Sequence, residues 1–143
     1  MTRIQRITRI VDLRGRALEA AQRELEAAVR RTEEARADAE RAEQILRTAE
    51  IEVARFAAGA ADDFATARTH LITLSLQFHR AQARLGRATD DEGEKRRMLS
   101  EAKREVRKVE LWRDSALGAQ AEEEARRERR ATDELAARRA RKA

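Results

Sequence analysis

The chain has 143 residues, of which 41% are charged and 3% are aromatic, with no cysteine, no proline and a formal net charge of +5. The lack of cysteine excludes a disulfide framework and thiolate metal ligands, and the scarcity of aromatic side chains argues against a compact globular core. A composition rich in Ala, Glu, Arg and Leu is typical of long helices or coiled coils, although high charge is also typical of disorder. The apolar periodicity decides between these two classes.

The first apolar periodicity begins at Ile4 and ends at Phe56. Steps of three and four residues alternate along it without a change of phase, and only Arg14 and Thr32 are not apolar. This is the a/d pattern of a supercoiled helix, and it predicts a first helix over about residues 3–57. The predicted seam consists of Ile4, Ile7, Val11, Arg14, Leu18, Ala21, Leu25, Ala28, Thr32, Ala35, Ala39, Ala42, Leu46, Ala49, Val53 and Phe56.

A turn is predicted at about residues 58–62, where the periodicity stops. Gly59 suits the left-handed conformation that often ends a helix. Asp62 or Asp63 suits the capping position of the next helix and its positive dipole end. The sequence therefore predicts two helices joined by a short connection.

A second periodicity predicts a second helix over about residues 63–118. Glu92, Lys95 and Arg113 interrupt it, and the stretch from Asp90 to Gly93 is its weakest part, which we interpret as a surface irregularity in preference to a hinge. The second predicted seam consists of Phe64, Ala67, Leu71, Leu74, Phe78, Ala81, Leu85, Ala88, Glu92, Lys95, Leu99, Ala102, Val106, Val109, Arg113 and Ala116.

Two helices of equal length joined by a short turn predict an antiparallel hairpin. If the chain folds back at residue 60, the numbers of facing residues sum to 120. Large side chains then face small ones along the seam, as close packing requires, and a slip of one heptad is the main rival register. The predicted facing pairs are Phe56 with Phe64, Val53 with Ala67, Ala49 with Leu71, Leu46 with Leu74, Ala42 with Phe78, Ala35 with Leu85, Ala21 with Leu99 and Leu18 with Ala102.

The segment 119–143 is predicted to be a charged tail, either helical or frayed, because Glu and Arg alternate there with Ala and only Leu135 is large and apolar. Residues 1–16 contain five arginines and one aspartate, and the tail contains eight lysines or arginines and six acidic residues. A hairpin brings both ends of the chain together. We therefore expect one basic end, which favours acidic partners.

Two groups of residues lie off the predicted seams. Ile72, Leu76, His79 and Ala83 are spaced four, three and four residues apart, so they line one outward face of the second helix and are either harmless exposed residues or a partner site. The second group lies near the basic end, where its members either cover the seam or bind a partner through Trp112, the only tryptophan. This second group consists of Ile10, Leu13, Leu111, Trp112 and Leu117.

Residues that could carry out chemistry are missing from the sequence. There is no glycine-rich phosphate loop, no Ser–His–acid arrangement and no zinc-ligand spacing, and His70 and His79 lie on different faces. We therefore expect no catalytic or metal site, no cofactor, no small-molecule substrate and no enzymatic activity. With neither a membrane-spanning stretch nor a secretory signal, the chain is expected to be cytoplasmic.

Both ends of the sequence resemble the FliJ/YscO family, the central stalks of type III export ATPases in flagella and injectisomes. The resemblance is carried by the opening Arg3-Ile4-Gln5-Arg6-Ile7 with Val11-Asp12-Leu13-Arg14 and Ala17, by Trp112-Arg113, and by the close of the chain, Arg126-Arg127-Glu128-Arg129-Arg130, Asp133-Glu134-Leu135-Ala136 and Arg138-Arg139. The resemblance covers essentially the whole length and implies a non-catalytic, antiparallel two-helix coiled coil. It leaves open whether the system is flagellar or an injectisome.

The resemblance also implies three partners: a hexameric export ATPase, the cytoplasmic domain of the export gate, and export chaperones. The chain would lie at the cytoplasmic base of the secretion apparatus and meet the membrane only through it. The residues assigned to the gate are Ile72, Leu76, His79 and Ala83, where His79 replaces an expected small residue. Those assigned to the ATPase ring are Arg3, Arg6, Arg9, Ile10, Leu13, Trp112, Arg126, Arg127, Arg129 and Arg130. Those assigned to chaperones are Arg129, Arg130 and Asp133.

Two other functions remain open at this point. A general cytoplasmic coiled-coil scaffold would associate with itself through its seam instead of closing into a hairpin. A nucleic-acid-binding protein would use the terminal arginines and lose affinity steeply with salt, but the mixed charges of the tail and the lack of a stacking platform disfavour it.

Overall fold

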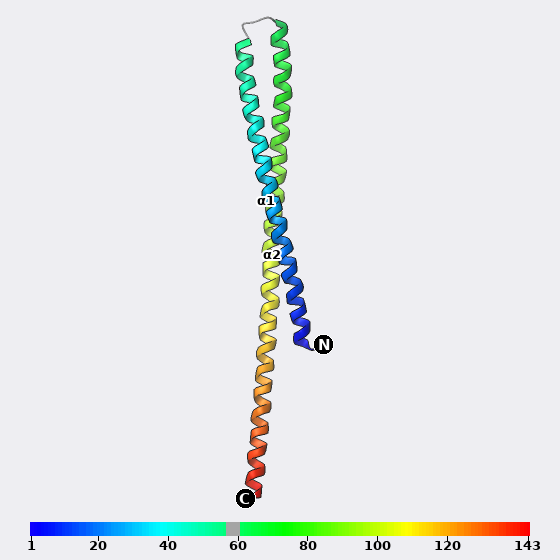
Figure 1. Ribbon diagram of the computed structural model, residues 1–143, viewed down its shortest axis with the longest axis vertical. Coiled ribbons are helices and arrows are strands. Elements are labelled where there is room, and N and C mark those ends of the chain that lie inside the picture. The colour runs from blue at the N-terminus through cyan, green and yellow to red at the C-terminus, as the bar shows by residue number, and fades with distance from the viewer. Residues whose placement is uncertain (57–60) are drawn as a thin grey trace. The chain divides into compact units, whose positions relative to one another are not determined.

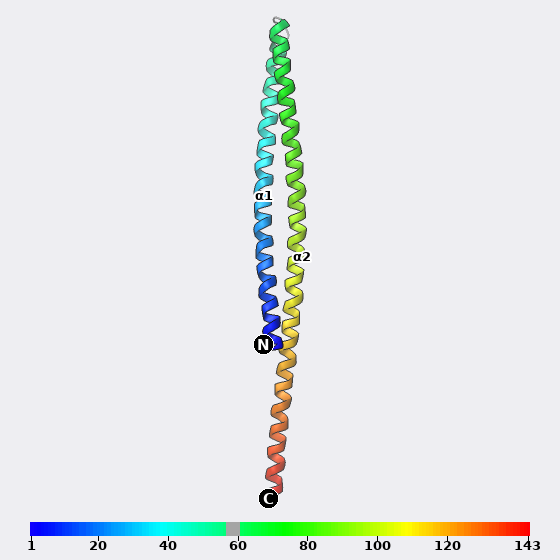
Figure 2. The ribbon, with the colours of Figure 1, turned by 90° about the vertical axis from the view of Figure 1, so that its right-hand side faces the viewer.

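The computed structural model describes residues 1–56 and 61–143, which form two helices and no strand. Helix α1 extends over Arg3–Phe56 and helix α2 over Ala61–Lys142 (Figures 1 and 2). The prediction of an all-α hairpin of two long, mutually packed helices is confirmed. The predicted turn with Gly59 lies outside the described residues, and so does the side chain of Phe56 with its predicted contact to Phe64.

Helix α1 begins with a capping box that the sequence analysis missed. The backbone N–H of Gln5 donates to the Thr2 hydroxyl oxygen at 3.2 Å, and the backbone N–H of Thr2 donates to the Gln5 amide oxygen at 2.9 Å. This reciprocal arrangement satisfies two N–H groups at the helix start. The pattern of Thr followed three residues later by Gln was a readable signal for it.

Helix α2 begins at Ala61, so Asp62 and Asp63 lie in its first turn and not before it. Carboxylates in a first turn still interact favourably with the helix dipole. The helix continues without interruption through the weak stretch at Asp90–Gly93 and through Gly118 to Lys142. None of the four described glycines has a positive φ, so none of them ends or breaks a helix.

The described residues group into two units, and the helices of each pack against one another. The central unit comprises Ala20–Leu99, and the terminal unit comprises Met1–Glu19 with Ser100–Ala143. In both units, residues of α1 with lower numbers contact residues of α2 with higher numbers. The two helices therefore run antiparallel.

The buried seam of the central unit is narrow and rich in alanine. Ala28, Ala39, Ala49, Leu74 and Ala81 are its buried apolar residues. Thr32 and Val109 are also buried, Arg14 and Phe64 are exposed, and the other described positions of the two predicted seams are half-buried. Alanine at these positions lets two helices approach closely enough for leucine or phenylalanine of the other helix to fill the space.

The register of the central unit is set by polar contacts as well as by packing. The Thr32 hydroxyl is buried, and its oxygen lies 3.0 Å from the Ala28 carbonyl oxygen in α1 and 3.2 Å from the Ala88 carbonyl oxygen in α2. Thr32 and Ala88 face one another in the predicted register, because their numbers sum to 120. The predicted register is therefore confirmed here, and Thr32, one of the two residues of the first seam that are not apolar, bonds across it.

Two ion pairs join the helices between this layer and the ends of the chain. Arg31 Nη2 lies 3.3 Å from Asp91 Oδ2, and Lys95 Nζ lies 3.5 Å from Glu24 Oε2. Asp91 belongs to the stretch that looked weakest in the sequence. Its carboxylate forms an ion pair with Arg31 of the other helix. This pair explains how the acidic stretch at Asp90–Gly93 is accommodated beside the seam.

Candidate functional site

The candidate sites are surfaces, because the clefts found among residues 1–56 and 61–143 are open and shallow. No group of histidine, cysteine or acidic side chains in the described ranges could hold a metal ion. None of the described helices has a stretch apolar enough to span a bilayer.

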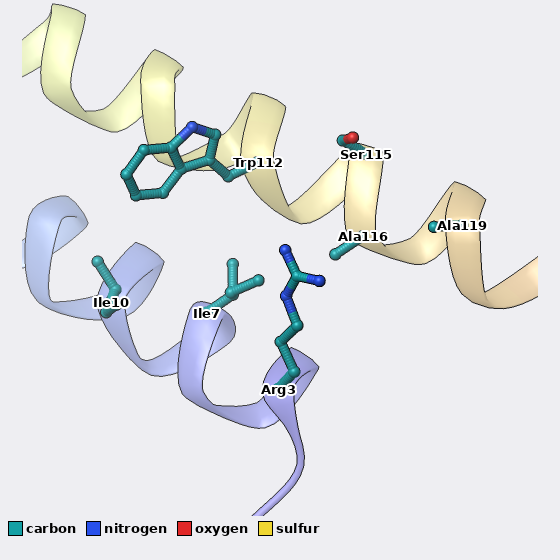
Figure 3. Close-up of a pocket in the computed structure, with 7 residues that line it drawn as sticks. All are labelled: Arg3, Ile7, Ile10, Trp112, Ser115, Ala116 and Ala119. Atoms are coloured by element: carbon teal, nitrogen blue, oxygen red, sulfur yellow. The ribbon is translucent and has the colours of Figure 1, made fainter.

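The terminal unit contains an open apolar cleft between its two helices. The cleft has a volume of about 410 Å³. Figure 3 shows the indole of Trp112 lying over Ile10 and the side chain of Arg3 extending from α1 towards Ala116. The residues that line the cleft are Arg3, Ile7, Ile10, Trp112, Ser115, Ala116 and Ala119.

Trp112 is the most unusual residue of this cleft, because its side chain is large and apolar yet 55% exposed. The Lys108 ammonium lies 5.7 Å from the centroid of its ring, which is within range of a cation–π interaction. The alternative that Trp112 and Ile10 cover the seam is met only in part, since Ile10 is 40% exposed. The cleft is thus a partly open apolar surface beside cationic groups.

The structure brings three of the residues assigned to the ATPase ring together at this cleft: Arg3, Ile10 and Trp112. Leu13 is exposed and does not line it. The sequence analysis missed the cleft itself, because it treated Ile7 and Ala116 as seam residues only. The signal was available, since Ile7 and Trp112 have numbers that sum to 119 and so lie almost opposite one another.

The other arginines assigned to the ring differ in their surroundings. Arg126 and Arg127 pair with Glu122 and Glu123, one turn earlier on α2, at 3.7 and 3.4 Å. In the part of the chain that the structure describes, no carboxylate lies within ion-pair distance of Arg3, Arg6 or Arg9. These three guanidinium groups are therefore available to an acidic partner.

The residues assigned to chaperones, Arg129, Arg130 and Asp133, are all exposed on the C-terminal part of α2. This part of the helix lies within the terminal unit and extends beyond the start of α1 in Figures 1 and 2. Leu135 is its exposed large apolar residue. The C-terminal part of α2 is therefore a mainly charged surface that includes the aliphatic side chain of Leu135.

The residues assigned to the gate form a continuous outward face on α2 in the central unit. Ile72 and Leu76 are 55% and 53% exposed, and His79 and Ala83 are also exposed. The neighbouring seam residues Leu71 and Leu74 are half-buried and buried. The predicted spacing thus places the four residues on the side of α2 that points away from α1.

The central unit has a further exposed aliphatic residue that the sequence analysis missed. Ile45 on α1 is 54% exposed and lines two shallow clefts, both of which also include Leu74. It occupies a non-seam position, so the criterion that selected Ile72 and Leu76 would also have found it. Ile51 and Met98 are exposed in the same way.

Comparison with known proteins identifies the family. The chain matches the family described as flagellar FliJ protein over residues 3–143.

The chain belongs to the FliJ family.

Members of the FliJ family are cytoplasmic, non-catalytic components of the flagellar export apparatus, and this chain is a component of that apparatus. The expected family is confirmed, and so is the prediction that the chain is not an enzyme. The matched family is described as the flagellar one. Neither a search of curated proteins nor a search of solved structures finds a significant match to the chain.

Proposed function

We propose that this FliJ-family chain is the central stalk of its export apparatus, with its paired termini inserted into the hexameric export ATPase. The observation that carries the proposal is the composition of the terminal unit. It joins both ends of the chain, and its 18 lysines and arginines exceed its 12 acidic residues, a formal net charge of +6. The central unit has 14 basic and 15 acidic residues, a net charge of −1.

The role of such a stalk is mechanical and allosteric. A single chain has no rotational symmetry, so its contacts with the six subunits of a ring are unequal. A partner that binds one subunit state better than another shifts the equilibrium towards that state. Unequal contacts would therefore bias the subunits differently and couple the ATPase to the export gate at the cytoplasmic base of the apparatus.

The experiment that tests the proposal is a binding assay with the purified export ATPase of the same organism. ATPase rate and ring formation are measured with and without the chain. We expect binding with higher activity or more hexamer, and loss of both when residues 1–16 or the segment after residue 119 are removed. A chain that does not bind and is dimeric in solution would support the scaffold alternative instead.

The gate would bind the outward face formed by Ile72, Leu76, His79 and Ala83. Two half-exposed aliphatic residues on one face support this, because contiguous exposed apolar surface marks interaction sites. Replacing Ile72 and Leu76 with Asp should lower the affinity for the cytoplasmic domain of the gate by on the order of tenfold, about 1.4 kcal/mol. The matched control is Ile51→Asp, which changes an equally exposed isoleucine of the same unit.

Chaperone binding would use Arg129, Arg130 and Asp133 on the exposed C-terminal part of α2. Reversal of both arginines to Glu should weaken capture of export chaperones, since charge-assisted contacts dominate such a polar surface. The control is the same reversal at Arg138 and Arg139, a second exposed pair on the same helix. Equal loss from both pairs would mean that chaperones respond to the net charge of the tail and not to these residues.

A further inference from the structure

We infer that the cleft beneath Trp112 is the anchor point for the ATPase, and that it accepts a large apolar side chain flanked by carboxylates. The inference rests on the proposed stalk function and adds to it the chemistry of the contact. A charged surface alone would orient the stalk in the ring but would not determine how far the stalk is inserted. An apolar side chain of the ATPase bound in the cleft would determine that position.

The cleft is exposed to solvent. Trp112 and Ile10 keep about half of their surfaces accessible although a seam lies directly beside them. Ile7, Ala116 and Ala119 complete an apolar floor between the two helices. Tryptophan is one of the residue types enriched among those that carry most of the binding energy at protein interfaces.

The residues that follow Trp112 along the cleft on α2 are small. Ala116 and Ala119 follow it at intervals of four and three residues, on the same side of α2 as the cleft. Larger residues at these two positions would fill the space, as leucine and phenylalanine do elsewhere along the seam. The vacant volume is therefore a property of the sequence at this place, and it is of a size suited to a side chain.

Cationic groups lie beside the cleft. The Arg3 guanidinium lies at its edge, and the Lys108 ammonium lies over the Trp112 ring. Arg6 and Arg9 follow on α1 without a carboxylate partner among the described residues. An apolar side chain would enter this surface most favourably from a segment that also presents acidic groups, because each guanidinium then gains a charge-assisted contact.

The test uses the full chain with Trp112 replaced by 5-hydroxytryptophan, which is excited at wavelengths where the tryptophans of the ATPase do not absorb. Trp112 is the only tryptophan of the chain, so the signal reports this site alone. Purified export ATPase is added, and binding is measured independently by sedimentation. We expect the acrylamide quenching of the label to fall by about half or more on binding, because the indole becomes covered.

Variants measure the contribution of the cleft to affinity. Trp112→Ala should weaken ATPase binding at least tenfold, a loss of about 1.4 kcal/mol, and Trp112→Phe should restore most of it. Leu117→Ala is the matched control, since Leu117 is also half exposed in the terminal unit and does not line the cleft. Helical content and melting temperature are recorded for each variant, so that a folding defect is recognised.

The possible outcomes distinguish a failure of the anchoring cleft from a failure of the stalk function. Binding with unchanged quenching, together with equal affinities of the Trp112→Ala and Leu117→Ala variants, would overturn the anchor and leave the stalk function intact. Absence of binding by the wild-type chain would overturn the stalk function and, with it, the occupant assigned to the cleft. Covered indole and a selective loss in Trp112→Ala would support both.

Discussion

The two units of this protein use the same helical pattern for different purposes. In the central unit, polar side chains in or beside the seam bond across the hairpin: Thr32 to the Ala88 carbonyl oxygen, Arg31 to Asp91, and Lys95 to Glu24. In the terminal unit, Arg3, Arg6 and Arg9 have no carboxylate within ion-pair distance among the described residues, and an apolar cleft lies open beside Arg3. The difference teaches that a charged residue in a coiled coil is informative only when its partner is known.

The largest expected effect on stability is in the seam of the central unit. Replacing Leu74, which is buried, with Ala should lower the free energy of unfolding by about 2–4 kcal/mol, because lost burial and an unfilled cavity add together. Chemical denaturation followed by circular dichroism measures it. Leu76→Ala, two residues further along the same helix and half exposed, should change the value by less than about 0.5 kcal/mol. Equal losses at both sites would contradict the assignment of the seam.

The charge difference between the units predicts an effect on binding and not on folding. Reversal of Arg3, Arg6 and Arg9 to Glu should lower the ATPase affinity by at least about tenfold and reduce its dependence on salt. The matched control reverses Arg30, Arg36 and Arg55, three exposed arginines on the same helix in the central unit. If the control weakens binding as much, net charge would be responsible, and the terminal unit would have no special role.

Glycines within the helices offer a smaller, stabilising change. A Cβ atom added at Gly93 would meet no atom within 4 Å, and its backbone is helical, so Gly93→Ala should stabilise the protein by about 0.5–1 kcal/mol. Denaturation monitored by circular dichroism checks this value. Gly118→Ala in the terminal unit meets equally open space. Hydrogen exchange should show its gain mainly as slower exchange in the neighbouring helical turns. A destabilising Gly93→Ala would mean that the helix bends at this position in solution.

The smallest expected effect comes from the ion pairs across the central unit. A double-mutant cycle of Glu24→Ala and Lys95→Ala should give a coupling energy of about 0.2–1 kcal/mol, since both groups are partly solvated. The coupling should decrease in high salt. A coupling near zero at low salt would leave packing and the Thr32 layer as the determinants of register.

The sequence alone determined the features that depend on regular spacing. Apolar residues at alternating intervals of three and four fixed both helices, and the complementarity of large and small residues fixed the register that Thr32 and Ala88 confirm. The outward face of Ile72 and Leu76 followed from the same periodicity. These features were predictable because a helix repeats its geometry at every turn, so that position along the chain determines direction in space.

Only the tertiary structure decided what the irregular residues do. Thr32 and Asp91 looked like defects until the opposite helix supplied a carbonyl oxygen and a guanidinium group as partners. Ile7 and Ala116 looked like ordinary seam residues until the structure showed them lining a cleft together with Trp112. Periodicity gives the direction of each side chain but not the space left after all of them are packed, and that space depends on the volumes and rotamers of residues from both helices together.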